Sequence, residues 1–281
     1  MQNENTHLMD IHLLAYNEEK YISQCIESFK SQLNENIHLV VLNDNSTDST
    51  LYLIKKNLKS VNKDFYKIIN LKKNIGRGAG RNLLASKSRA KYMATIDADD
   101  ICYPNRFKKQ LEFMSNNDEI DLSGGYADLF EKENFLQCED LSKSYSNIKV
   151  VKRIRKPISH NNIVKNLWLN PLINPTICIK RSALLKANNY DPNLRTGQDY
   201  DLWFRLYINN SKFANLPIPL IYYRKSSPKK YNYKDYILTY KIAKSYRLQI
   251  PCLNRFTLLL IYLRCLYKTI YASKKIKINN I

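Results

Sequence analysis

Short apolar runs alternate with amphipathic segments through the first part of the chain. The runs occupy residues 10–16, 37–44, 66–71 and 91–97. Each has the length of a strand, and the segment after the first run carries apolar residues at helical spacing, from Tyr21 to Phe29. Strand alternating with helix predicts an α/β fold with a mostly parallel sheet flanked by helices. In such sheets ligands bind beyond the carboxyl ends of the strands.

Polar residues between the runs predict where helices begin. Asn17 is expected to be the N-cap of the first helix, with the acids Glu18 and Glu19 in its first turn. Pro104 is expected to be the first residue of the helix that follows the fourth strand. Beyond residue 120 the pattern is less regular, and residues 131–160 are expected to form a polar loop or excursion. A helix is predicted again at GQDYDLWFRL, and IPLIYYRKSS is expected to close the core.

The charge of the chain is concentrated near its end. The net charge is +20, and residues 224–281 contain 14 Lys and Arg but one acid, Asp235, which gives 14 − 1 = +13. This excess indicates a surface that meets an anionic partner, although an AT-rich genome would also enrich lysine. Basic residues alternate there with aromatic and apolar ones, which is typical of a helix in a membrane interface. The alternative is that the tail packs on the rest of the protein.

Cysteines and the ends of the chain carry little chemistry. The six cysteines include no CxxC pair, so reduced thiols are expected, and neither a disulfide framework nor a zinc site. The start MQNENTHLMD does not resemble a signal peptide. The apolar run FTLLLIYL is too short to span a bilayer, which takes about 20 residues.

Carboxylates follow two of the predicted strands. Asp44 ends the second, and Asp97, Asp99 and Asp100 end the fourth. One carboxylate can cap the next helix, but three close together repel one another unless a cation lies between them. Oxygen ligands of this kind favour Mg²⁺ or Mn²⁺. The sequence therefore predicts a metal site that meets substrate phosphates at this edge of the sheet.

Four separated blocks resemble the family 2 glycosyltransferases, which are inverting enzymes of GT-A fold. The blocks are AYNEEKYISQCIESFKSQ, VVLNDNSTDST, DADD and GQDYDLWFRL, and together they span about residues 10–225. Each block alone is weak, but their order and spacing are specific to the superfamily. The resemblance implies a Rossmann-like nucleotide-diphospho-sugar transferase domain at 1–228. Its nucleotide-binding half is expected at about 8–120 and its acceptor-binding half at about 121–228, followed by a basic amphipathic helical tail at 229–281.

The resemblance assigns the first two blocks to the nucleotide. Ala15, Tyr16 and Glu18 are expected to hold the nucleobase and ribose, with Tyr16 against the ring and Glu18 accepting from a hydroxyl. Asp44 is expected to accept from the pyrimidine N3–H, although it could merely cap the following helix. Many members have two adjacent acids here, whereas this chain has Asn43 before Asp44.

A glycine-rich segment, NIGRGAGRN, resembles a dinucleotide-binding loop. Its spacing is G-x-G-x-G, however, and the other blocks argue against that function. The resemblance instead implies that Arg77 or Arg81 reaches the base or a phosphate of the donor.

The last two blocks carry the expected chemistry. In DADD, which corresponds to the family's D-x-D motif, Asp97 is expected to contact ribose or metal and Asp99 to bind the metal. Ala98 lies between them, and Asp100 is expected to support them. Asp199 aligns with the base that deprotonates the acceptor hydroxyl. The alternative is that Asp199 and Asp201 cap the helix, and Arg205 is placed to pair with Asp201.

Three further residues are candidates for the acceptor side. Asn170 and Asn174 fall where the family forms part of its acceptor wall. His160 is a candidate for the same cleft, although a loop histidine is more often simply solvated. The other three histidines, in or beside the early strands, are expected to be structural.

These residues lead to one functional expectation. The protein is expected to transfer a sugar from a UDP-hexose or UDP-N-acetylhexosamine, with Mn²⁺ or Mg²⁺, to a hydroxyl of a bacterial surface glycan or glycolipid precursor. It is expected in the cytoplasm or on the inner face of the plasma membrane, touching the membrane through residues 229–281 and binding no nucleic acid. The alternatives are a nucleotidyltransferase, a basic nucleic-acid- or membrane-binding protein, and an inactive relative.

Overall fold

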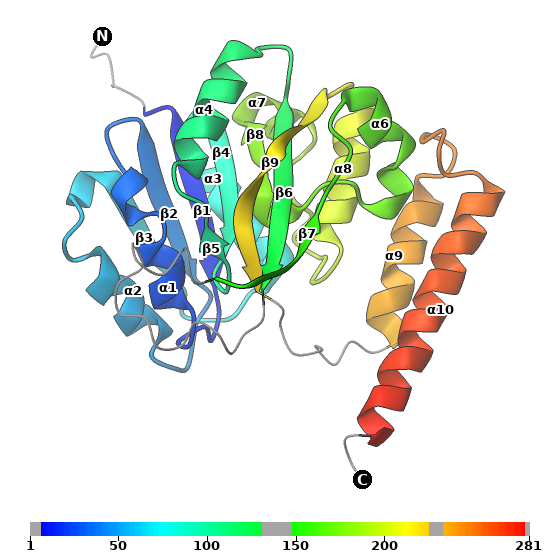
Figure 1. Ribbon diagram of the computed structural model, residues 1–281, viewed down its shortest axis with the longest axis horizontal. Helices are drawn as coiled ribbons and strands as arrows, with labels where there is room; N and C mark the ends of the chain where they lie inside the picture. The colour runs from blue at the N-terminus through cyan, green and yellow to red at the C-terminus, as the bar shows by residue number, and fades with distance from the viewer. Residues whose placement is uncertain (1–6, 131–147, 225–232, 279–281) are drawn as a thin grey trace.

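A mixed β-sheet runs through the protein (Figure 1). The computed structural model describes residues 7–130, 148–224 and 233–278, and nine strands in these residues form the sheet. Eight of them follow the order β3-β2-β1-β4-β8-β6-β9-β5, and β7 pairs with β6. The strands are β1 Met9–Ala15, β2 Ile37–Asn43, β3 Tyr66–Asn70, β4 Tyr92–Asp97, β5 Ile101–Cys102, β6 Leu122–Phe130, β7 Val150–Ile154, β8 Cys178–Lys180 and β9 Phe213–Arg224.

The first four strands are parallel, as predicted. In their register Ala15 lies opposite Asn43, and Leu14 lies opposite Asp97, so the carboxyl ends of β1, β2 and β4 reach the same edge. Beyond β4 the sheet becomes mixed: β8 is antiparallel to β4 and β6, whereas β9 is parallel to β6. The predicted α/β class is confirmed, and its parallel part is the half that carries the sequence blocks before residue 100.

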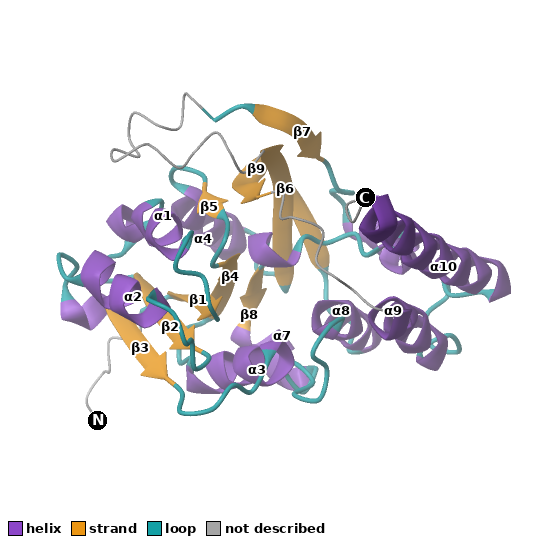
Figure 2. Cartoon of the chain, turned by 90° about the horizontal axis from the view of Figure 1, so that it is seen from below, coloured by secondary structure: helices purple, strands orange, loops and turns teal. Residues whose placement is uncertain are grey.

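Helices cover both faces of the parallel strands (Figure 2). On one face lie α1 (Ile22–Glu27), α2 (Thr50–Leu58) and α4 (Arg106–Asn116), whose apolar side chains share a core with β1 and β2. On the other face lie α3 (Arg77–Lys87) and α7 (Arg181–Lys186). Strand residues alternate between these faces, so the buried runs of β1 and β2 supply both cores.

Two predicted helix starts are wrong. Helix α1 begins at Ile22, and Asn17 instead adopts a left-handed conformation (φ 55°), where its Oδ1 accepts from the backbone N–H of Thr47 at 2.8 Å. It thus ties the loop after β1 to the loop after β2. Helix α4 begins at Arg106, so Pro104 precedes the helix. Tertiary contacts between loops outweigh the local capping preference at Asn17.

The basic tail forms two helices, α9 (Tyr233–Ser245) and α10 (Arg255–Ile278), which lie side by side, with α9 against α8 (Gln198–Ile208) (Figures 1 and 2). Ile242, Ala243, Leu258 and Ile261 are buried in the same core as Trp203 of α8. The inner faces of both tail helices therefore pack on the rest of the protein.

The cysteines and the predicted polar loop lie only partly within the described residues. The five cysteines within the described residues are free thiols, and Cys138 lies outside those residues, as does 131–147 of the predicted loop. For the rest of 131–160 the loop prediction is wrong in part, because Val150–Ile154 form β7 by pairing with β6. No helix in the described ranges is both long and apolar enough to cross a bilayer.

Candidate active site

A cleft of about 1110 Å³ opens beyond the carboxyl ends of β1, β2 and β4. Its opposite walls come from the start of α8, from segments around 154–156 and 168–175, and from α9 and α10. Of the predicted donor-side and catalytic residues, nine line it, whereas Ala15 and Asp100 do not: Tyr16, Glu18, Asp44, Arg77, Arg81, Asp97, Ala98, Asp99 and Asp199. Ala15 is fully buried at the end of β1, where its carbonyl accepts from the N–H of Asp44 at 2.9 Å.

Asp44 and the loop after β1 form one end of the cleft. Asp44 is buried, and its Oδ1 and Oδ2 accept from the backbone N–H groups of Ile75 and Gly76 at 2.8 and 2.9 Å. The carboxylate thus holds the turn before α3, and the expectation that it merely caps the helix after β2 is wrong. Each carboxylate oxygen has a second lone pair, so Asp44 can still accept from a ligand. Tyr16 is 48% exposed and offers a ring face there.

Arg81 connects the acids at the centre of the cleft. It is buried, and its Nη2 donates to Oδ1 of Asp97 at 2.7 Å. The amide oxygen of Asn174, in the orientation its neighbours require, accepts from both terminal nitrogens of Arg81 at 3.1 and 2.9 Å. Burial lowers the pKa of Arg81, but the charges of Asp97, Tyr190 and Asp199 outweigh burial and raise the pKa overall. Arg81 is therefore a permanent cation between Asp97 and Asp199.

The turn Asp97–Asp100 brings three carboxylates together. One ligand atom from each of Asp97, Asp99 and Asp100 lies within 4.8 Å of the others. Burial, followed by the charges of Asp99 and Asp97, raises the pKa of Asp100 well above its usual value. This mutual repulsion and the all-oxygen donor set fit a hard divalent cation such as Mg²⁺ or Mn²⁺.

Arg224, at the end of β9, supports this turn, a contact that no sequence block indicated. Its backbone N–H donates to Asp100 Oδ1 at 3.0 Å, and its Nε donates to the carbonyl of Asp99 at 2.7 Å. Its guanidinium also lies over the rings of Tyr21 and Phe130. Arg224, which lies in the half of the sheet beyond β4, thus positions the carboxylates of this turn.

Asp199 and Asp201 have different environments at the start of α8. Asp199 lies in the first turn, after Gly197 in a left-handed conformation (φ 72°), and it lines the cleft. Asp201 instead accepts from Arg205 Nε at 2.9 Å and from the Tyr246 hydroxyl at 2.7 Å. The predicted pairing with Arg205 is confirmed, and neither acid makes a side-chain cap.

The glycine-rich segment serves packing. A Cβ on Gly78 would lie 2.3 Å from the carbonyl oxygen of Leu194 and 2.4 Å from that of Asp191, so only glycine lets α3 approach this loop. A Cβ on Gly80 would meet the Leu14 side chain at 2.9 Å. These glycines bring Arg77 and Arg81 close to the loop that leads to Asp199. Packing thus explains the spacing of these glycines, and a dinucleotide-binding function is not needed to account for it.

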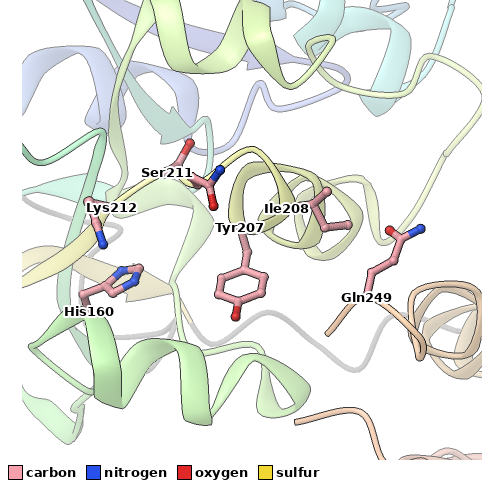
Figure 3. A pocket seen from close by; sticks show the side chains of 7 residues that line it. His160, Tyr207, Ile208, Ser211, Lys212 and Gln249 are labelled. Carbon is pink, nitrogen blue, oxygen red and sulfur yellow. The ribbon is translucent and has the colours of Figure 1, made fainter. Parts of the chain in front are cut away.

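His160 does not line this cleft. It lines a separate hollow of about 390 Å³ with Tyr207, Lys212 and Gln249 (Figure 3). Its Nδ1 accepts from the N–H of Phe213 at 3.2 Å, and its ring stacks on the Phe213 ring. The expectation for His160 as a cleft residue is therefore wrong, whereas Asn170 and Asn174 do line the cleft.

Several cleft residues were not found by sequence reasoning. They are Lys156, Trp168, Arg195, Arg264 and Lys268. Lys156 and Trp168 lie where the hydrophobic pattern is irregular. The basic pattern of the tail was visible, but nothing in it indicated that one face of α10 turns toward the cleft.

The chain matches the sequence profile of a known protein family. The profile described as "Glycosyl transferase family 2" matches residues 10–168, more than half of the chain. The chain belongs to glycosyltransferase family 2. It is accordingly a glycosyltransferase, which decides against the nucleotidyltransferase and nucleic-acid-binding alternatives.

Relatives and solved structures agree with this family. An uncharacterized glycosyltransferase of Methanocaldococcus jannaschii is 31% identical over 88% of this chain and 80% of its own length. The amylovoran biosynthesis glycosyltransferase AmsE of Erwinia amylovora is 27% identical over 78% and 77%.

Two solved structures share the fold. S. aureus TarS 1–349, in complex with UDP-GlcNAc, aligns with a TM-score of 0.63 at 18% identity, covering 86% of this chain and 66% of TarS. The mannosyltransferase PcManGT of Pyrobaculum calidifontis, in complex with GDP-Man and Mn²⁺, aligns with a TM-score of 0.64 at 10% identity, covering 98% and 76%.

Proposed function

We propose that this family 2 glycosyltransferase moves a sugar, with inversion, from a UDP-sugar to a hydroxyl of a surface glycan or of its lipid-linked precursor. The observation that carries the proposal is the cleft itself, in which Asp44, the Asp97–Asp99 turn and Asp199 converge from separate parts of the chain. The UDP-GlcNAc in TarS and the polysaccharide role in the name of AmsE support the donor and acceptor classes.

Residues 8–120 would hold the nucleotide. Tyr16 would lie against the uracil ring, Glu18 would accept from a ribose hydroxyl, and Asp44 would accept from the N3–H. Arg77, at the exposed start of α3, would face the diphosphate, where the helix N-terminus also favours negative charge. Arg81 is committed to Asp97, so it would act by positioning that carboxylate and not by direct contact with phosphate.

Residues 97–99 would hold the metal, and residues 121–228 would present the acceptor. Asp99 and Asp97 would be the protein ligands of the metal, and a bound divalent cation would offset the charge that develops on the leaving diphosphate. Asp199 would accept the proton of the attacking hydroxyl.

Nucleotide release from a donor panel tests the proposal. We expect Mn²⁺- or Mg²⁺-dependent release of UDP from one of UDP-glucose, UDP-galactose, UDP-GlcNAc and UDP-GalNAc, abolished by EDTA. GDP-mannose belongs in the panel because PcManGT was solved with it. Turnover of GDP-mannose alone would contradict the UDP assignment, and binding of no nucleotide sugar with either metal would contradict the proposed activity.

We also propose that the outer face of α10 meets the inner surface of the plasma membrane. Phe256, Leu259, Leu263 and Tyr267 recur at helical spacing and are 66, 51, 49 and 67% exposed. This apolar stripe lies in the most basic part of the chain, a combination typical of interfacial helices on anionic lipid.

Vesicle binding tests the membrane contact. We expect co-sedimentation with vesicles containing phosphatidylglycerol, weakened about tenfold or more when Phe256, Leu259 and Leu263 are changed to Ser, because their apolar area no longer leaves water. Matched Ser substitutions at Tyr52 and Leu185, which are exposed on α2 and α7, are the control and should change nothing. Equal loss in both variants, or no binding by the wild type, would contradict the contact.

A further inference from the structure

One wall of the cleft carries positive charge from segments far apart in the chain. Lys156 follows β7, whereas Arg264 and Lys268 lie on α10. The carboxylates that line the cleft are Glu18, Asp44, Asp97, Asp99 and Asp199, all from other segments. The three cations therefore share one cavity with the donor-side acids but come from different segments of the chain.

The cations are close enough to affect one another. Burial lowers the pKa of Lys156, and the charge of Arg264 lowers it further. Burial, followed by the charge of Arg264, also lowers the pKa of Lys268. Within the described residues neither Lys156 nor Arg264 forms an ion pair with a carboxylate. Arg264 and Lys268 are exposed and Lys156 is half-buried, so solvent screens the repulsion among them in part, and an anion placed between them would remove the rest.

Local geometry directs these side chains to the cavity. Ile261, Arg264, Cys265 and Lys268 recur at helical spacing and all line the cleft, so one face of α10 forms the wall. Nζ of Lys156 donates to the carbonyl of Asn170 at 2.8 Å. An ammonium group has three N–H donors, so this bond anchors Lys156 and leaves donors for a ligand.

The cationic wall begins beside the proposed base. Tyr200 follows Asp199 in α8, and its hydroxyl donates to the carbonyl of Trp168 at 3.1 Å. Arg264 acts electrostatically on this hydroxyl, whereas Asp199 acts on Arg81. Asp199 and Tyr200 both line the cleft, so a molecule held by the cations can present a hydroxyl to Asp199.

We propose that Lys156, Arg264 and Lys268 bind a phosphate group of the acceptor, so that the acceptor substrate is a phosphorylated sugar. The inference rests on the proposed function and specifies its substrate class. The phosphate belongs to a lipid-linked sugar or to a soluble sugar phosphate. Trp168, Leu238 and Ile261 line the cavity with the cations and supply apolar surface for the first carbons of a lipid.

Binding of simple probes tests the proposal without knowledge of the acceptor sugar. With UDP and Mn²⁺ present in excess to fill the donor site, we would titrate geranyl phosphate, geraniol and glucose 1-phosphate, all below aggregation, and follow tryptophan fluorescence. Trp168 lines the wall and Trp203 is buried, so the signal should disappear in Trp168→Phe. Geranyl phosphate should bind and geraniol should not. Competition by glucose 1-phosphate would indicate a soluble sugar phosphate, and its failure to compete would indicate a lipid-linked one.

Replacing charged side chains by Gln tests whether binding depends on these three cations or on the overall positive charge of the tail. Lys156→Gln, Arg264→Gln and Lys268→Gln should each weaken geranyl phosphate about tenfold, since a charge-assisted hydrogen bond is worth about one decade or more. The matched control is the triple variant Lys241→Gln, Arg247→Gln and Arg255→Gln, which removes three exposed tail charges outside the cleft and should bind normally. Arg264→Lys keeps the charge and should retain most of the affinity.

Opposite results would overturn the inference. These are equal binding of geraniol and geranyl phosphate, undiminished binding in the three cleft variants, or equal loss in the control. Failure of this test with normal UDP release from the donor panel would leave the transferase function standing. Probe binding through the cations without turnover of any donor would instead contradict the proposed function alone.

Discussion

Asp199→Asn is expected to lower kcat for sugar transfer by about 10²- to 10⁴-fold, the usual contribution of a general base. The amide has the shape of the carboxylate but cannot take the proton of the attacking hydroxyl. Affinity for the nucleotide sugar should remain near normal, because Asp199 belongs to α8 and the proposed nucleotide contacts come from residues before 100. Initial rates at saturating donor, together with calorimetric binding of UDP, measure the two effects separately.

The matched control for this variant is Asp118→Asn. Asp118 is 78% exposed and pairs with Lys91 and Lys180 on the surface, so the same change of side chain there should leave transfer intact. Asp201→Asn is unsuitable as a control, because Asp201 is buried and holds Arg205 and Tyr246. Transfer by Asp199→Asn at nearly the wild-type rate would assign the base to another group.

Asp99→Asn is expected to weaken Mn²⁺ binding in the presence of UDP and to lower kcat/KM by about 10²- to 10³-fold. An amide oxygen carries no net charge, so the turn loses part of the negative charge that attracts the cation. The free Mn²⁺ signal in electron paramagnetic resonance measures binding directly, and UDP release measures turnover. EDTA should abolish turnover of the wild type, and added Mn²⁺ or Mg²⁺ should restore it.

Asp118→Asn serves again as the control and should bind Mn²⁺ as the wild type does. Full turnover of the wild type in EDTA, with nucleotide-sugar binding retained, would contradict the metal site. Unchanged Mn²⁺ binding by Asp99→Asn would move the site away from this carboxylate.

Sequence reasoning located the parallel strands because their signal is local. Of the first four strands, β1, β2 and β4 are short buried runs between polar segments, and β3, at the edge of the sheet, is only partly buried. Strand ends in a parallel sheet meet at one edge. Asp44 and Asp97 were therefore placed at the cleft by their positions in the chain. The helix starts at Asn17 and Pro104 were predicted wrongly, because contacts between loops and the entry into α4 depend on parts of the chain that a local pattern does not include.

By itself, the sequence determined the α/β class, the positions of the first strands along the chain, the family and the acids at the strand ends, since each is carried by short stretches of adjacent residues. Only the tertiary structure decided which distant side chains share the cleft. Arg224 reaches the Asp97–Asp100 turn through the pairing of β9 with β5 and β6, and Gly78 owes its identity to the carbonyls of Asp191 and Leu194. The cations of α10 meet Lys156 because buried apolar residues dock the tail on α8. Hydrophobic burial is non-directional, so the face of α10 that is turned toward the cavity depends on the packing of the whole chain.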